Sequence, residues 1–117
     1  MLMRRYRSSK FGNIPTRIDG RLFHSKIEAA RYSELKALQA GGIITDLECQ
    51  PKFSLDVDGC HVCTYVGDFK YTDSESGRLV VEDVKGVLTR EYQIKAKLML
   101  AIHGIEVQEI RRVRGMR

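Results

Sequence analysis

The chain has 117 residues, 43% of them hydrophobic and 30% charged, with a formal net charge of +5, which together predict one domain with a modest core. No apolar run approaches the roughly 18 to 20 residues of a membrane span, and the arginine-rich start lacks the apolar core of a signal peptide, so we expect a soluble protein without membrane contact. Three cysteines, an odd number, argue against a disulfide framework and indicate a reducing compartment, so we expect a cytoplasmic protein.

Residues 1–14 form a predicted basic arm, because they lack hydrophobic periodicity and contain Gly12 and Asn13. Residues 15–110 are predicted to form a single domain, and residues 111–117 a basic tail. Residues 1–31 hold eight Lys and Arg against two acids, and the tail holds four Arg and no acid, whereas residues 32–110 hold eight basic and thirteen acidic residues. Basic ends around an acidic middle suit a polyanion held by the ends, although solvated tails that aid solubility are an alternative.

The first predicted elements are a hairpin and a helix. Residues 16–23 read as a small hairpin around an Asp19-Gly20 turn. Ser25 is a suitable N-cap with Glu28 three residues later, and an apolar stripe of helical spacing then continues to a stop at residues 41–42, both glycine.

The middle of the chain predicts strands. One region covers residues 43–47 and continues after Pro51 through residues 53–57, and two more strands span roughly residues 61–71 and 78–85. Their connecting loop, Ser74 to Gly77, has the composition of a hairpin turn.

A second helix and a last strand complete the predicted order. Thr89 can cap a helix that runs to about His103, and Gly104 ends it. Residues 105–110 alternate apolar and polar side chains, as a strand does. The order helix, three antiparallel strands, helix, strand (α-β-β-β-α-β) predicts an α/β fold in which a mixed central β-sheet is flanked by helices.

Acidic side chains occur in the two central strands, where a core would favour apolar groups. If the loop is centred between residues 75 and 76, symmetric pairing sets Asp68 opposite Asp83, with Cβ atoms roughly 4.5–5.5 Å apart. Lys85 then shares the face of Asp83, whereas Glu82 and Val84 point the other way. Two carboxylates about 4 Å apart repel by roughly 4 kcal/mol at an effective dielectric near 20, so the pair favours a bound divalent metal.

Three short motifs resemble those of the PD-(D/E)xK nuclease superfamily, in particular small phage-encoded members similar to Holliday-junction resolvases. They are Phe-His-Ser-Lys-Ile-Glu-Ala at residues 23–29, Asp-Phe-Lys-Tyr at 68–71 and Glu-Asp-Val-Lys-Gly at 82–86, and the likeness spans about residues 17 to 110. The chain departs from the pattern at Gly67, where the superfamily name expects a proline. The resemblance implies a restriction-endonuclease-like core and metal-dependent hydrolysis of DNA.

The resemblance also implies roles for individual residues. Asp68, Asp83 and the backbone carbonyl of Val84 would bind Mg²⁺ or Mn²⁺, the hard cations that oxygen ligands suit, and Glu28 would complete the metal shell directly or through water. Lys85 would orient the attacking water or offset charge on the phosphate. The catalytic set is therefore Glu28, Asp68, Asp83 and Lys85.

Several of these residues have structural alternatives. The Glu28 carboxylate could instead complete a capping box with Ser25, and the two aspartates could form surface ion pairs with Lys70 or Lys85. Glu82 is interpreted as structural or as part of a salt bridge that supports the site.

Two further patterns could indicate function. A zinc site at Cys60 and Cys63, with Cys49 and His24 elsewhere, lacks a second Cys-x-x-Cys pair, so the cysteines are interpreted as small core residues. His24 could touch phosphate, but a helix-entry role is the more common one.

DNA contacts are predicted for basic side chains along the chain. Tyr92 and Lys95 lie one helical turn apart and could reach the site, as a polar residue there often does in relatives. The full set of candidate DNA-binding residues is Arg4, Arg5, Arg7, Arg17, Lys26, Lys95, Arg111, Arg112 and Arg114.

The function expected from these observations is that of a Mg²⁺-dependent endodeoxyribonuclease that acts on branched or structured DNA in phage recombination, repair or genome processing. By analogy with resolvases we expect a homodimer, in the host cytoplasm if the protein is phage-encoded. Two alternatives stay open, which are a non-catalytic DNA-binding accessory protein with the same fold and a sequence-specific nicking or homing-type nuclease.

Overall fold

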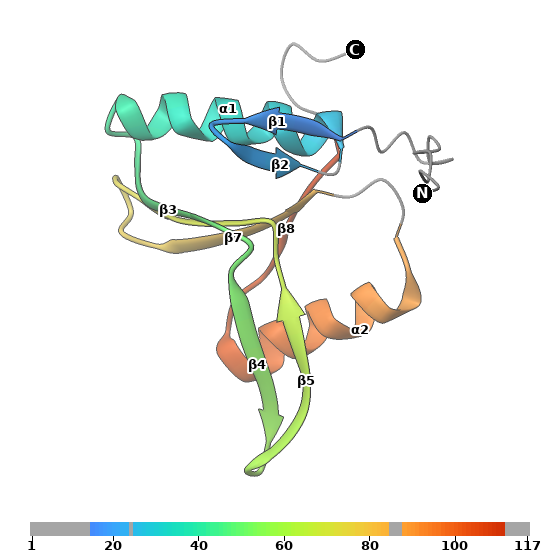
Figure 1. The fold of residues 1–117 in the computed structure, drawn as a ribbon. Helices are drawn as coiled ribbons and strands as arrows, with labels where there is room; N and C mark the ends of the chain where they lie inside the picture. Colours follow the sequence, from blue (N-terminus) through green and yellow to red (C-terminus); the bar gives the residue numbers. More distant parts are fainter. Residues whose placement is uncertain (1–14, 24, 85–87, 112–117) are drawn as a thin grey trace, which may run out of the picture.

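The computed structural model describes residues 15–23, 25–84 and 88–111. Two short strands lead into helix α1, five strands follow, and helix α2 continues into a π-helical turn, η1, before the last strand (Figure 1). The bounds are β1 Thr16–Ile18, β2 Arg21–Phe23, α1 Lys26–Ala40, β3 Ile44–Cys49, β4 Lys52–Val57, β5 Cys60–Val66, β6 Phe69–Asp73, β7 Leu79–Val84, α2 Arg90–Leu98, η1 Met99–His103 and β8 Gln108–Ile110.

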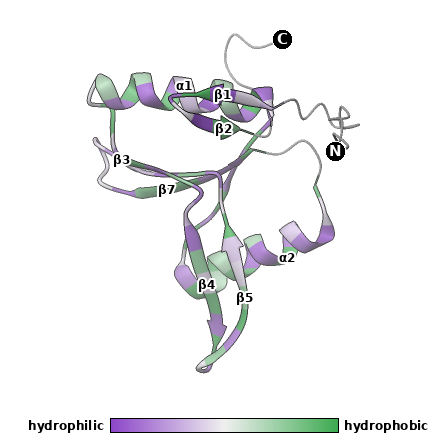
Figure 2. Ribbon diagram, viewed as in Figure 1, coloured by the Kyte–Doolittle hydropathy of each residue, from purple (hydrophilic) through white to green (hydrophobic). Residues whose placement is uncertain are grey.

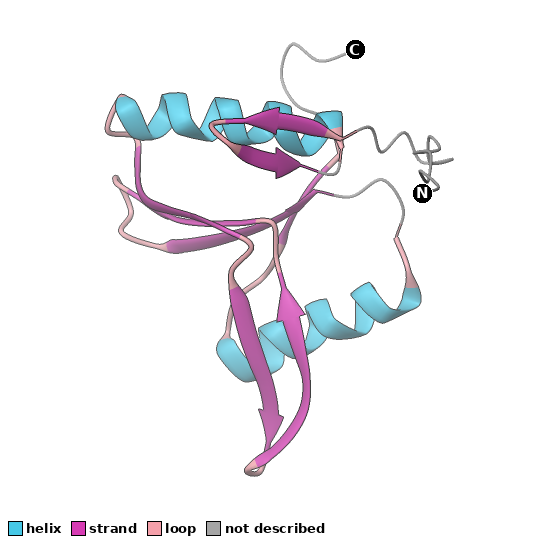
Figure 3. Ribbon diagram, in the orientation of Figure 1, coloured by secondary structure: helices cyan, strands magenta, loops and turns pink. Residues whose placement is uncertain are grey.

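The central sheet has four strands in the order β3-β6-β7-β8. Neighbours pair antiparallel except β7 and β8, which pair parallel, so the expected mixed sheet is confirmed. Two separate hairpins, β1-β2 and β4-β5, complete the strands, and the second extends away from the sheet beside α2 (Figure 3). The fold is therefore of the α/β class.

The predicted helix starts and stops are confirmed. The Oγ of Ser25 accepts a hydrogen bond from the backbone N–H of Glu28 at 3.1 Å, and the Oγ1 of Thr89 accepts one from Tyr92 at the same distance, so both helices begin at the predicted caps. Gly104 ends η1 in the left-handed conformation, with φ of 69°, which glycine adopts without steric cost. The last strand is shorter than predicted and covers only Gln108–Ile110.

The prediction of one strand over residues 61–71 is wrong. The chain leaves the β4-β5 hairpin at Val66 and enters the central sheet at Phe69, so residues 67 and 68 form a corner between two sheets. At this corner the Gly67 N–H donates to the carbonyl of Pro51 at 3.0 Å, and the Asp68 N–H donates to the carbonyl of Glu82 at 2.9 Å. The corner also changes the predicted element order, because β4 and β5 pair with each other outside the central sheet.

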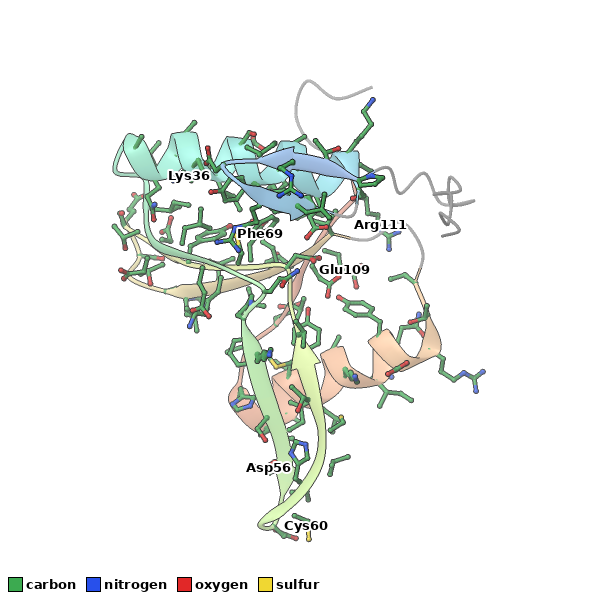
Figure 4. All side chains as sticks on the ribbon, viewed as in Figure 1. Lys36, Asp56, Cys60, Phe69, Glu109 and Arg111 are labelled. Atoms are coloured by element: carbon green, nitrogen blue, oxygen red, sulfur yellow. The ribbon has the colours of Figure 1, made fainter. Side chains whose placement is uncertain are left out.

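Two hydrophobic cores lie on opposite faces of the central sheet. The first joins α1 and the β1-β2 hairpin to the sheet, and Phe69 lies within it, fully buried between α1 and the sheet (Figure 4). The second joins Val81 of β7 to the β4-β5 hairpin, α2 and η1. Hydrophilic residues are interspersed along both helices (Figure 2), as expected for helices that each cover one face of a sheet.

The interpretation of the cysteines as core residues is wrong for Cys60. This residue is exposed at the tip of the β4-β5 hairpin (Figure 4), because the hairpin projects beyond the second core. Cys49 and Cys63 are partly buried and pack against the first and second core, respectively.

Candidate active site

Strand β7 places two buried acids on opposite faces of the central sheet. Glu82 is 1% exposed and Asp83 is 5% exposed. Glu82 points toward α1, where Arg31 Nε donates to Oε1 at 2.8 Å, Arg31 Nη2 donates to Oε2 at 2.5 Å, and the Tyr71 hydroxyl also donates to Oε2. The salt bridge, one of the two expectations for Glu82, is present in the structure.

The pairing of β6 with β7 brings Asp68 next to Asp83. Phe69 pairs with Glu82 and Tyr71 with Val80, and the same register continued by one residue sets Asp68 opposite Asp83, as predicted. Asp68 lies just before β6, and its Oδ2 accepts a hydrogen bond from the Val84 N–H at 2.7 Å. Lys70 pairs with Glu48 at 3.0 Å, so the alternative of an Asp68–Lys70 surface ion pair is not what the structure contains.

Glu28 joins this acid pair from the first turn of α1. The side chain is buried, with 7% of the residue exposed, although glutamate is a residue that normally faces solvent. Its carboxyl group lies close enough to Asp68 to contribute to the raised pKa of that residue. The Ser25 half of the predicted capping box is formed, yet the Glu28 side chain reaches the acid pair.

The environment of Asp68 favours its protonated form. Burial, the neighbouring charges of Asp83 and Glu28 and the hydrogen bond with Glu28 raise its pKa to about 7, against the Val84 N–H, which lowers it. A divalent cation at this position would favour the charged carboxylate instead. The acid pair therefore has the electrostatic property expected of a cation site.

A pocket of about 220 Å³ opens beside Asp83, between β5, β7 and α2. Tyr92 and Lys95 line it together with Asp83, so both residues of the second helix lie beside the proposed acid pair. Lys95 Nζ lies 3.2 Å from Glu91, which also lines the pocket and whose side chain is 77% exposed. A cationic group and an acid of the proposed metal pair thus face one hollow.

Sequence reasoning missed three residues that contact these acids. The Tyr65 hydroxyl donates to Asp83 Oδ2 at 2.5 Å, and Arg31 and Tyr71 bind Glu82. Glu109 was also missed, although it pairs with Asp83 across the parallel strands β7 and β8. Tyr65 lies in an apolar run three residues before Asp68, and this position could have indicated that it contacts the acids. No local sequence pattern indicates the parallel pairing that brings Glu109 to Asp83.

The predicted DNA-binding and catalytic residues divide into described and undescribed groups. Arg17, Lys26 and Arg111 are exposed, and Arg111 lies 3.2 Å from Glu109. Seven further candidates lie outside the described part of the chain, and they are His24, Lys85, Arg4, Arg5, Arg7, Arg112 and Arg114.

The donor chemistry of the site suits a hard cation. Within residues 15–23, 25–84 and 88–111, no three His, Cys, Asp or Glu side chains are arranged to hold a metal ion, and His24, one of the zinc candidates, lies outside these residues. Asp68 and Asp83 could still hold Mg²⁺ or Mn²⁺ as a carboxylate pair, because these ions keep several water ligands and need few from the protein. Val84, whose carbonyl is the third predicted ligand, follows Asp83 directly in sequence. Its N–H donates to Asp68, so this residue is in contact with the acid pair.

Comparison with known proteins gives a family. No curated protein and no solved structure matches the chain. No helix in the described segments is both long and apolar enough to cross a membrane. Residues 3–116 match the model of the family described as "Protein of unknown function (DUF1064)", and because this match covers nearly the whole chain, the protein belongs to that family.

Proposed function

We propose that the protein is a metal-dependent endodeoxyribonuclease with a restriction-endonuclease-like core. The observation that carries this proposal is that Asp83 of β7 and Glu28 of α1 both lie near Asp68 at the corner before β6, and that burial and these two acids raise the pKa of Asp68 to about 7. Ordinary surface carboxylates avoid such crowding, so a function that requires it is the simplest explanation. The resemblance to the PD-(D/E)xK superfamily supports the same reading.

Each residue of the proposed site has its own role in the hydrolysis. Asp68, Asp83 and the Val84 carbonyl would bind Mg²⁺ or Mn²⁺. Glu28 would complete the ligand shell of the ion, directly or through water. When bound, the cation polarises the scissile phosphate and makes a bound water more acidic. Glu28 lies against Asp68 and can hold a proton at that carboxyl group, while the Lys95 ammonium in the adjoining pocket can bind a phosphate oxygen.

Lys85 is proposed as the cation that orients the water. It follows Asp83 by two residues, and side chains two apart on a strand share a face. The position itself lies beyond the end of the described strand β7, so this role rests on sequence spacing.

Branched or structured DNA is the proposed substrate, in phage recombination, repair or genome processing. The basic ends of the chain, which together carry a net charge of +10, would hold the phosphate backbone around an acidic metal site. A symmetric four-way junction needs two cuts, so a homodimer is the proposed assembly.

The test is cleavage of a supercoiled plasmid and a four-way junction with Mg²⁺ or with EDTA. We expect wild type to cut only with metal, and Asp68→Asn and Asp83→Asn to lose cleavage while keeping DNA binding. Asp58→Asn, a change of an exposed acid at the tip of the β4-β5 hairpin, is the matched control and should cut as wild type does.

Other outcomes identify the alternatives. DNA binding without metal-dependent cutting would replace the proposal with a non-catalytic accessory role. Cutting at one discrete site on natural DNA, without preference for branches, would indicate a sequence-specific nicking or homing-type nuclease.

A further inference from the structure

Two buried tyrosines donate hydrogen bonds to the two adjacent acids of β7. The Tyr65 hydroxyl donates to Asp83 Oδ2 at 2.5 Å, and the Tyr71 hydroxyl donates to Glu82 Oε2. Because Glu82 and Asp83 are neighbours on one strand, these two contacts lie on opposite faces of the sheet. Tyr65 and Tyr71 thus make the same kind of hydrogen bond, one at the proposed metal site and one on the other face of the sheet.

Tyr65 reaches Asp83 from a different sheet. It lies on β5 of the protruding hairpin, pairs with Phe53 of β4 and is 3% exposed. Its ring lies 6.4 Å from the ring of Phe53 and 6.5 Å from that of Tyr92, both measured between centroids. These two ring contacts therefore restrict where the phenol oxygen lies.

The Tyr65 side chain has one O–H to donate, and Asp83 Oδ2 accepts it. An ionised aspartate has only acceptor atoms, so the Tyr65 proton is directed at Asp83.

We propose that Tyr65 is a positioning residue for Asp83, which orients this carboxylate for the cation and is supplied by the β4-β5 hairpin. This inference rests on the proposed function, because it assigns Tyr65 a role toward the same metal. Ligating carboxylates are themselves held by hydrogen bonds in metal sites, and loss of such a partner typically weakens metal affinity or activity by about 10-fold to 100-fold.

The test compares two substitutions that each remove one hydroxyl and almost no volume. Tyr65→Phe removes the donor to Asp83, and Tyr71→Phe removes the donor to Glu82 on the other face. Mn²⁺ binding to the full chain, followed by electron paramagnetic resonance of the free ion without DNA, is the first readout. We expect the dissociation constant to rise by about 10-fold in Tyr65→Phe and by less than about twofold in Tyr71→Phe.

The measured affinities decide the inference. Equal Mn²⁺ affinity in Tyr65→Phe and wild type, or an equal loss in both phenylalanine variants, would overturn it. Thermal unfolding in EDTA accompanies each titration, so that a general loss of structure is detected separately.

A double substitution keeps the inference testable should Tyr65→Phe fold poorly. Removing both partners of a buried hydrogen bond leaves no unpaired group, so Tyr65→Phe combined with Asp83→Ala should fold as well as Asp83→Ala. If Tyr65 acts through Asp83, the double variant and Asp83→Ala bind Mn²⁺ with the same affinity. A further loss in the double variant would contradict the inference.

Failure of this inference is distinguishable from failure of the proposed function. If the wild-type protein binds no Mn²⁺ and cuts no DNA, the proposed function itself is contradicted. If Mn²⁺ binding is weaker in Asp83→Ala than in wild type, but unchanged in Tyr65→Phe, only the inference about Tyr65 is contradicted.

Discussion

The backbone N–H of Val84 donates to Asp68 Oδ2 at 2.7 Å. This bond connects the end of β7 to the residue before β6. The carboxyl group of Asp68 is thus held by the backbone of β7. It also favours the ionised form of a carboxyl group that burial otherwise drives toward protonation. The bond therefore fixes the position of one carboxylate oxygen of Asp68.

The pKa of Asp68 predicts how stability depends on pH in metal-free protein. The folded pKa of about 7 lies above the ordinary value of 3.8, so the folded state binds the proton more tightly and the free energy of unfolding falls as pH rises from about 4 to 7. Asp68→Asn removes this group. In urea unfolding with EDTA, we expect the variant to equal wild type near pH 4 and to exceed it by about 2 to 4 kcal/mol above pH 7.

The matched control for this experiment is Asp58→Asn, whose difference from wild type should stay constant over the same range. A constant difference for Asp68→Asn would contradict the raised pKa.

The Arg31–Glu82 pair predicts a large loss of stability when only one partner is removed. Their side chains are 16% and 2% exposed, and Arg31→Met would leave the Glu82 charge buried with the Tyr71 hydroxyl as its remaining described partner. We expect a cost of about 3 to 5 kcal/mol in urea unfolding. The double variant Arg31→Met and Glu82→Met should regain most of that free energy, and a double variant as unstable as the single one would disprove this reading.

Gly67 explains why this chain can depart from the proline expected before Asp68. Its N–H donates to the Pro51 carbonyl, and proline has no N–H, so Gly67→Pro should prevent stable folding. A methyl group added here would lie 3.2 Å from Val81 Cγ1 and 3.3 Å from Tyr65 Cε2, and we expect Gly67→Ala to cost about 1 to 3 kcal/mol.

Thermal or urea unfolding measures this effect. Gly41→Ala, where the nearest atom would be 3.6 Å away, is the control and should change stability little. Equal costs at the two glycines would contradict the interpretation that crowding at the corner is the cause.

Lys95 is expected to contribute to DNA binding with little effect on stability. Its partner Glu91 is largely exposed, and such ion pairs contribute at most about 1 kcal/mol. Lys95→Ala should weaken DNA binding and reduce the slope of log affinity against log salt by about one, as loss of one phosphate contact does. Lys97→Ala on the same helix is the control, because Lys97 is exposed and does not line the pocket; an equal salt slope in both variants would remove Lys95 from the site.

The parts of the structure that follow from local patterns were predictable. The caps at Ser25 and Thr89 were identified because a side chain acts on a backbone three residues away. The register that sets Asp68 opposite Asp83 followed from the symmetry of a short loop.

Features that depend on distant pairing were not predictable. The run of residues 61–71 gives no hydrophobic signal of its break, since the corner is made by bonds from Gly67 and Asp68 to Pro51 and Glu82. Glu109 meets Asp83 only through parallel pairing of β7 and β8, whose partners are 26 positions apart in sequence, as their register shows.

The corner at Gly67 and Asp68 has a consequence for local unfolding. Asp83 is held by a hairpin that belongs to the second core, and Asp68 by the sheet and by Glu28 of the helix that covers the first. Opening the first core would withdraw Glu28 and opening the second would withdraw Tyr65, while the pairing of β6 with β7 keeps the two aspartates together. Amide hydrogens of the hairpin that exchange through such partial opening would therefore report the lifetime of the assembled site.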